Sequence, residues 1–168
     1  MQVEVFRFGF GDIKLMQTKL SRYYYCYAAQ GGFLYLRHAG LSDYDELMNY
    51  SAKMVNDDSW KNGAKFFTDL RWVDNREFNF DTYHQLAQDI ASLYEKNGRY
   101  FCQVVTLCSN DFEFGMHRMF QSAWGDDELT LNTVRDLDEA VESLGIDREL
   151  LDEIIAEVDR IESSLNPL

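Results

Sequence analysis

The sequence predicts an α/β fold, in which helices cover a mixed β-sheet of four to five strands. Runs rich in aromatic and β-branched residues alternate with stretches of helical periodicity along most of the chain. In the second half, helices separate the strand-like runs, which favours parallel strand pairs. Near the N-terminus, a short glycine-containing turn joins two strand-like runs, which predicts an antiparallel hairpin and therefore a mixed sheet.

The hairpin is the clearest local signal in the N-terminal region. Residues 23–29 and 33–37 are dominated by tyrosine, phenylalanine, leucine and alanine, and a Gln-Gly-Gly turn separates them. Residues 3–10 also alternate in hydrophobicity as a strand does, although Gly9 and Gly11 weaken that prediction.

Helical periodicity and capping residues predict five helices after the hairpin. Ser42 is the expected N-cap of the first helix. The expected helices span about residues 42–56, 80–96, 110–123, 136–144 and 147–164. The expected strands between them span about residues 64–70, 100–107 and 129–134.

The chain is expected to form a single domain, residues 1–168, because no Pro/Gly/Ser-rich linker divides it. Its expected core spans residues 20–145, and residues 146–168 are expected to form a C-terminal helical extension. That extension is amphipathic, and it is expected to pack on its own sheet, to pair with a second copy or to dock on a partner. The candidate interface residues on its apolar stripe are Leu151, Ile154, Ile155, Val158 and Ile161.

Charge and composition exclude several classes of partner. The formal net charge is −13, and residues 126–162 hold 14 acidic residues against three arginines. An acidic surface repels phosphate backbones and anionic lipids, so we expect no nucleic-acid partner. No apolar run approaches the roughly 20 residues of a membrane span, and no signal-peptide pattern is present, so no integral membrane association is expected. Three cysteines without a CxxC spacing favour reduced thiols and a cytoplasmic location.

An ordered set of short motifs runs from the hairpin through Leu144, over about 120 residues. The set comprises Gly40-Leu41-Ser42, then Trp60, Phe67-Thr68-Asp69-Leu70-Arg71, Val104-Val105, residues 115–120 (GMHRMF) and residues 134–144 (VRDLDEAVESL). In this order the motifs resemble the SpoIIAA-like group, relatives of the STAS domain of anti-sigma-factor antagonists. The resemblance implies a mixed α/β sheet of four or five strands and a regulatory or binding role rather than turnover.

The resemblance also implies a phosphorylation site, with one departure. Anti-sigma-factor antagonists carry a phosphorylatable serine at the start of the helix after the central strand. No serine occurs here between Ser59 and Ser92, and Thr82 is the phosphorylation candidate that takes its place. This departure argues against a kinase-controlled partner switch but not against the fold.

Polar candidates are expected at the carboxyl ends of the strands, where open α/β sheets bind ligands. Asp69 and Arg71 end the central strand, and Trp72, Asp111 and Arg118 are expected near the same rim. The alternative interpretation is structural: Asp69 caps the next turn, and Arg71 pairs with it or with a neighbouring acid.

No cofactor and no metal ion are expected. The sequence has neither GxxxxGK[ST] nor GxGxxG, the two common phosphate-binding patterns. The histidines are scattered, and Glu113 and His117, which share a helical face, are expected to form an ion pair rather than a metal site.

We therefore expect a non-enzymatic binding or regulatory domain, which acts through a protein partner or holds a small apolar ligand. The first alternative is an enzyme with its site at the rim near Asp69, Arg71 and Asp111. The second is a purely structural homo-oligomer, with a homodimer as the simplest case.

Overall fold

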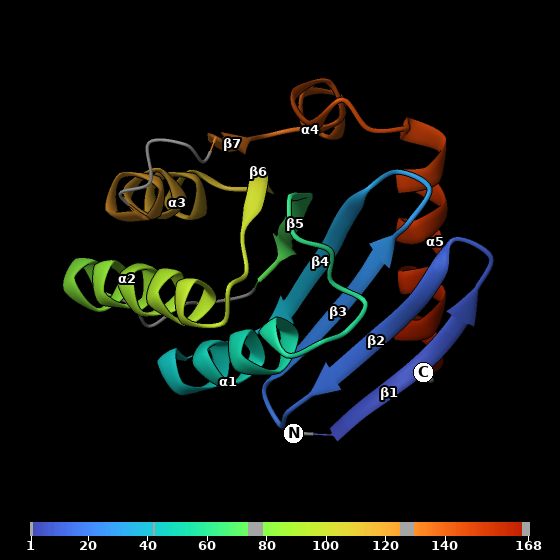
Figure 1. Ribbon diagram of the computed structural model, residues 1–168, viewed down its shortest axis with the longest axis horizontal. Coiled ribbons are helices and arrows are strands. Elements are labelled where there is room, and N and C mark those ends of the chain that lie inside the picture. The colour runs from blue at the N-terminus through green and yellow to red at the C-terminus, as the bar shows by residue number, and fades with distance from the viewer. Residues whose placement is uncertain (1, 42, 74–78, 125–129, 166–168) are drawn as a thin grey trace.

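The computed structural model describes residues 2–41, 43–73, 79–124 and 130–165. Within them a single mixed sheet runs through the molecule, with helices on both faces (Figure 1). The sheet has seven strands, and their spatial order follows the chain from β1 to β7. None of the helices in these ranges is long and apolar enough to cross a membrane.

The first four strands form an antiparallel meander. They are β1 (Gln2–Phe8), β2 (Gly11–Gln17), β3 (Ser21–Ala28) and β4 (Phe33–Gly40). The expected hairpin is β3–β4, and β1–β2 is a second hairpin that precedes it.

The prediction of four to five strands is therefore wrong, because it missed the N-terminal hairpin. Gly9 and Phe10 form the turn between β1 and β2, so the glycines mark a chain reversal rather than a weakened strand. A Cβ atom at Gly11 would lie 2.7 Å from the carbonyl oxygen of Tyr27, which explains why a residue without a side chain begins β2.

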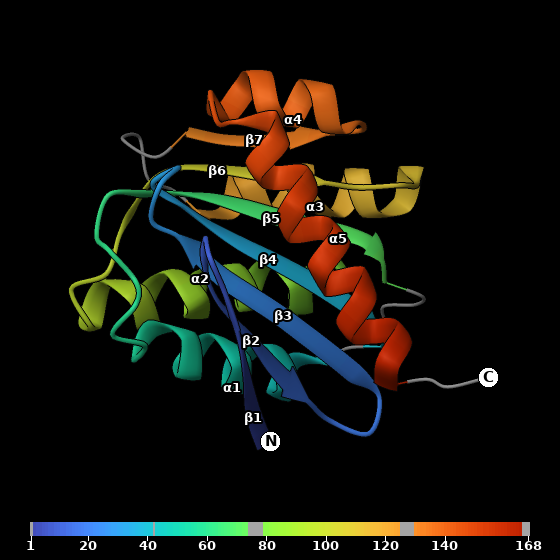
Figure 2. The ribbon, with the colours of Figure 1, turned by 90° about the vertical axis from the view of Figure 1, so that its right-hand side faces the viewer.

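The last three strands run parallel to β4. They are β5 (Ala64–Trp72), β6 (Phe101–Leu107) and β7 (Thr130–Val134). The connections are α1 (Tyr44–Val55), α2 (Phe80–Lys96) and α3 (Asp111–Trp124). All three helices cover one face of the sheet, because right-handed crossovers between successive neighbouring strands place every helix on the same side (Figure 2).

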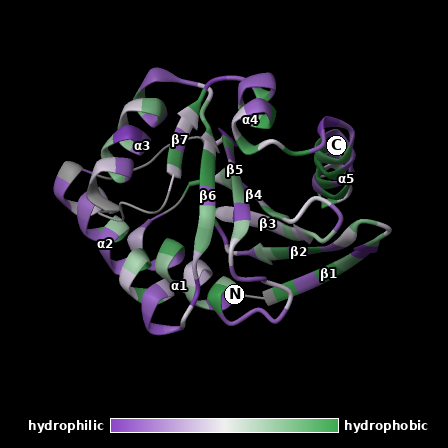
Figure 3. Cartoon of the chain, turned by 45° about the horizontal axis from the view of Figure 1, so that its top comes forward, coloured by the Kyte–Doolittle hydropathy of each residue, from purple (hydrophilic) through white to green (hydrophobic). Residues whose placement is uncertain are grey.

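The opposite face is covered by α4 (Leu137–Leu144) and α5 (Arg148–Leu165). Figure 2 shows α5 crossing diagonally over the middle strands. Hydrophobic residues follow the central strands, and the helices carry hydrophilic residues on their outer surfaces (Figure 3). The expected helices are present, each within about two residues of its expected bounds.

Local hydrogen bonds explain where these helices begin and end. The carboxylate of Asp43 accepts a hydrogen bond from the backbone N–H of Glu46, at 2.9 Å, and caps α1. Ser42, the expected cap, lies outside the described residues. Gly145 adopts the left-handed conformation, with φ of +56°, and ends α4.

The strand β3 shows how the sheet separates the two larger of the three hydrophobic clusters in the described residues. Tyr23 and Tyr25 pack towards α1, α2 and α3, whereas Tyr24 and Cys26 pack in the core that contains α5. All four side chains are buried. Both faces of this strand are therefore covered by the protein's own helices.

Candidate functional site

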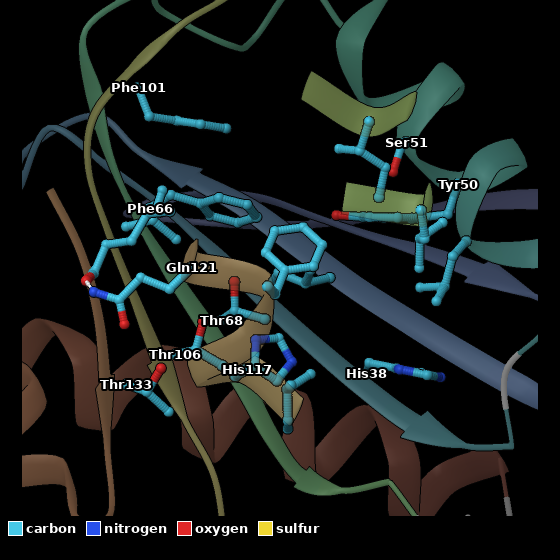
Figure 4. A pocket seen from close by; sticks show the side chains of 18 of the residues that line it. His38, Tyr50, Ser51, Phe66, Thr68, Phe101, Thr106, His117, Gln121 and Thr133 are labelled. Carbon is cyan, nitrogen blue, oxygen red and sulfur yellow. Dashed lines mark hydrogen bonds between the residues drawn. The ribbon is translucent and has the colours of Figure 1, made fainter. Parts of the chain in front are cut away.

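A cavity of about 120 Å³ lies between the sheet and the helices α1, α2 and α3 (Figure 4). Strands β3 to β7 contribute to its floor. Most of its lining is apolar, with Leu36, Phe66, Leu86, Ile90, Phe101 and Val104 as representative residues. This volume is somewhat smaller than the roughly 150 Å³ of a cavity with similar walls that accommodates benzene in another protein, but the pocket is also partly open to solvent, so its size suits a compact organic molecule.

One end of the cavity is aromatic. The rings of Phe66 and Phe101 stack with centroids 4.6 Å apart, and Phe101 also stacks on Trp60 at 4.4 Å. The motif residue Trp60 is thus a buried support behind the cavity wall. These rings come from β5, β6 and the loop before β5, so the aromatic end is held by the sheet and is rigid.

The floor carries a row of three threonines. Thr68 of β5 is in register with Thr106 of β6, and Thr106 is in register with Thr133 of β7. All three line the cavity, and they lie together in Figure 4, away from Phe101. The row exists because three parallel strands place a threonine at the same register position on the same face.

Two histidines reach the cavity from different elements. The ring of His117 on α3 shares a hydrogen bond of 2.8 Å with the Tyr83 hydroxyl of α2. The ring of His38 on β4 stacks on Tyr23, with centroids 4.5 Å apart. Among the described lining residues there is no aspartate, glutamate, lysine or arginine, so the cavity has no permanently charged wall.

The rim candidates divide between several places. Asp69 is fully buried, and it pairs with Arg71 through contacts of 2.9 Å to Nε and 2.7 Å to Nη2. Its carboxylate also lies 3.5 Å from the Nε atom of the buried Arg37. Trp72 is exposed, and its ring centroid lies 5.4 Å from the Arg37 guanidinium carbon. These four residues form one cluster.

Asp111 and Arg118 make other contacts. Asp111 is exposed at the start of α3 and pairs with Arg135 at 2.7 Å. Arg118, later in the same helix, donates a hydrogen bond of 3.2 Å to Gln121. The structure thus brings Asp69, Arg71 and Trp72 together but gives Asp111 and Arg118 separate partners.

Thr82 occupies the first turn of α2. Its backbone N–H donates a hydrogen bond of 2.9 Å to the side chain of Asn79, which caps the helix. Within the described residues no group of three or more histidine, cysteine, aspartate or glutamate side chains is arranged to hold a metal ion.

The candidate interface residues of α5 face the chain's own sheet. Leu151, Ile154, Val158 and Ile161 are at most 2% exposed in the core that α5 shares with the strands. Ile155 is partly buried at the margin of that core. Of the three outcomes expected for this stripe, packing on its own sheet is the one observed within this chain.

The sequence does not predict the cavity, because the residues that line it are far apart in the chain and meet only in the folded protein. The signal that was present is the polar threonine within two apolar strand runs, at Thr68 and Thr106. A threonine in a buried strand is common, however, and only the register aligns these two with Thr133.

No protein-family model and no curated protein matches this sequence. The structure is similar to a crystal structure of an uncharacterized protein of the DUF3478 family from Shewanella loihica PV-4, described as having a SpoIIAA-like fold. The two chains are 13% identical, the match covers 86% of this chain and 96% of that chain, and the TM-score is 0.43. The fold family in that description is the one that the motifs of this sequence resemble.

Proposed function

We propose that this protein is a binding domain that holds one compact, largely apolar molecule in the cavity between the sheet and α1, α2 and α3. The observation that carries the proposal is the cavity itself, about 120 Å³ with mostly apolar walls. The core on this face of the sheet is otherwise tightly closed, with side chains such as Tyr23, Met54 and Val55 at 0–1% exposure. Beside such packing, an unfilled apolar pocket favours a bound molecule.

The free energy of burying apolar surface favours a bound molecule in this cavity. The pocket is partly open to solvent, because lining residues such as Val104 and Leu131 are half-buried, so water contacts its apolar walls when no ligand is bound. An apolar molecule that fills the pocket displaces this water and itself gains from leaving water. Binding would therefore stabilise the folded protein, by an amount that rises with ligand concentration.

The enzyme alternative at the rim has less support. Both carboxylate oxygens of Asp69 accept hydrogen bonds from Arg71, and Arg37 lies close to the same group. Because Asp69 also has no exposed surface, a substrate in solution has no direct route to this carboxylate. This arrangement favours the structural interpretation of the Asp69–Arg71 pair.

Toluene is a suitable probe, because it is small, apolar and aromatic. We expect saturable binding of toluene to the native protein, detected by isothermal titration calorimetry and by an increase in melting temperature. Val104 lines the cavity from β6, so Val104→Phe should fill the space and abolish the binding while the protein stays folded.

Val141→Phe is the matched control, because Val141 lies on α4, across the sheet from the cavity, and is partly buried. It should leave toluene binding unchanged. The proposal fails if native protein shows no saturable binding, or if Val104→Phe binds toluene as well as the native protein does.

A further inference from the structure

The threonine row makes one end of the cavity polar, whereas the other end is aromatic. From this difference we infer the chemical class of the ligand. We propose that the ligand is amphipathic, with an uncharged hydroxyl or carbonyl group held by Thr106 together with its neighbour Thr68 or Thr133, and an apolar body held by the aromatic end. This inference rests on the proposed function, since it specifies the molecule that the same cavity would hold.

The geometry of the row suits a single polar group. Neighbouring strands in a sheet lie about 4.8 Å apart, so a polar group placed between two adjacent threonines of the row is within hydrogen-bonding reach of both hydroxyls. Thr68 and Thr106 are 9% and 7% exposed. Each hydroxyl both donates and accepts, so the row can bind a hydroxyl or a carbonyl oxygen.

The three hydroxyls are available to a ligand. In the part of the chain that the structure describes, none of them makes a side-chain hydrogen bond with another protein group. Thr133 is half-buried, and the hydroxyls of the row are open to water when the cavity has no occupant. A ligand that displaces this water must therefore offer a polar group of its own, or the hydroxyls lose their hydrogen bonds. A wholly apolar occupant would leave the row unsatisfied.

Charge selects against an ionised head group. The described cavity walls contain neither lysine nor arginine, so a carboxylate or phosphate would lose its water without gaining a permanent cation. The nearby His117 ring already shares its Nε2 atom with the Tyr83 hydroxyl. An uncharged polar group carries a much smaller desolvation cost and is matched by the threonines.

The opposite end fixes the orientation of the apolar body. Phe101 lies away from the three threonines in Figure 4, with Phe66 between them, and Leu86 and Ile90 of α2 contribute further apolar surface. A ring or short hydrocarbon chain is therefore expected against the phenylalanines, with its polar group towards the three strands.

Phenol and toluene test this inference, because they have nearly the same shape and differ by a hydroxyl against a methyl group. Calorimetric titration of the native protein should show phenol binding at least about fivefold more tightly than toluene, although toluene is the more hydrophobic. Thr106→Val removes the central hydroxyl and keeps the side-chain shape. It should weaken phenol binding by about fivefold to tenfold and leave toluene binding unchanged or stronger.

Thr130→Val is the control, since Thr130 is exposed on β7 and does not line the cavity. If Thr106→Val fails to fold by circular dichroism, the double variant Thr68→Val/Thr133→Val, which removes both neighbouring hydroxyls, serves the same purpose. Equal or tighter binding of toluene by the native protein overturns the inference and leaves the proposed function standing. Benzoate, which carries an ionised carboxylate, is the third probe. If benzoate binds more tightly than phenol, the proposal that the ligand's polar group is uncharged is wrong. Binding of none of the three overturns the proposed function as well.

Discussion

Asp57 joins three parts of the sequence through one carboxylate. Its oxygens accept hydrogen bonds from Lys14 of β2 at 2.5 Å, from the Tyr25 hydroxyl of β3 at 2.6 Å and from the backbone N–H of Ser59 at 2.8 Å. Burial by itself would raise the pKa of Asp57, but these hydrogen bonds outweigh it and lower the pKa to about 2. The ionised carboxylate therefore ties the loop after α1 to the antiparallel half of the sheet.

This pKa predicts how stability depends on pH. The folded pKa lies below the ordinary value of 3.8, so the stabilisation is complete above about pH 4 and is lost as the pH falls towards 2. The shift corresponds to about 2 kcal/mol. Asp57→Asn should lower the free energy of unfolding at neutral pH by about this amount and flatten its decline between pH 4 and 2.

Urea unfolding at several pH values measures the effect. Asp58→Asn is the matched control, because Asp58 is the next residue and its side chain is exposed. A pH profile for Asp57→Asn that runs parallel to that of the native protein would show that this carboxylate does not contribute as described.

At the scale of elements, α5 is part of the core rather than an appendage. Its apolar stripe packs on the sheet, and its Asp159 forms an ion pair with Arg37 of β4. Arg37 has no exposed side-chain surface and also donates a hydrogen bond of 3.1 Å to the Tyr35 hydroxyl. Both apolar and ionic contacts therefore hold this helix against the middle of the sheet.

The position of α5 predicts different effects for two neighbouring isoleucines. Ile154 is fully buried against the sheet, so Ile154→Ala should lower the free energy of unfolding by about 2–5 kcal/mol. Ile155 lies at the margin, and Ile155→Ala should cost about 1 kcal/mol or less.

Urea titration combined with light scattering separates packing from assembly. If the stripe were instead an interface between copies, Ile154→Ala would dissociate a dimer without a large loss of monomer stability.

For the whole molecule, the two cores share the same strands. Trp60 belongs to the core beneath α1, α2 and α3, and Cys26 belongs to the core beneath α4 and α5. Because β3 contributes to both cores, neither can be lost while the other keeps its native sheet.

We therefore expect the two cores to unfold in one transition. Fluorescence of Trp60, in a variant with Trp72→Phe and Trp124→Phe, reports on one core during urea unfolding. Protection of Cys26 from thiol reagents reports on the other, and burial raises the pKa of Cys26 to about 12, which suppresses its reactivity in the native state. Both probes should give the same free energy of unfolding, and two separate midpoints would contradict the shared-sheet description.

The measurement on Cys26 requires that the other two cysteines, Cys102 and Cys108, be replaced. Cys102 is exposed and should react with the reagent at once in the native protein, whereas Cys108 is 1% exposed. Cys102→Ser removes the rapid background reaction, and Cys108→Ala leaves Cys26 as the thiol that is followed.

The local part of the architecture was predictable from the order of the residues. Helix α2 has the predicted bounds, because its apolar spacing and its Asn97-Gly98 ending are contained within one stretch of chain. The hairpin β1–β2 was not predicted, since glycines at a strand end and glycines in a turn look alike without the partner strand. Its pairing with β3 is a non-local contact.

The candidate site was predictable only in its general character. Composition and alternation alone establish a helix-covered sheet, an acidic C-terminal region and the absence of phosphate-binding motifs. The cavity and its threonine row depend on the register between β5, β6 and β7, which are separated by whole helices in the chain. That register arises when the strands pair and the helices pack over them, so it follows from contacts between distant residues that no local pattern encodes.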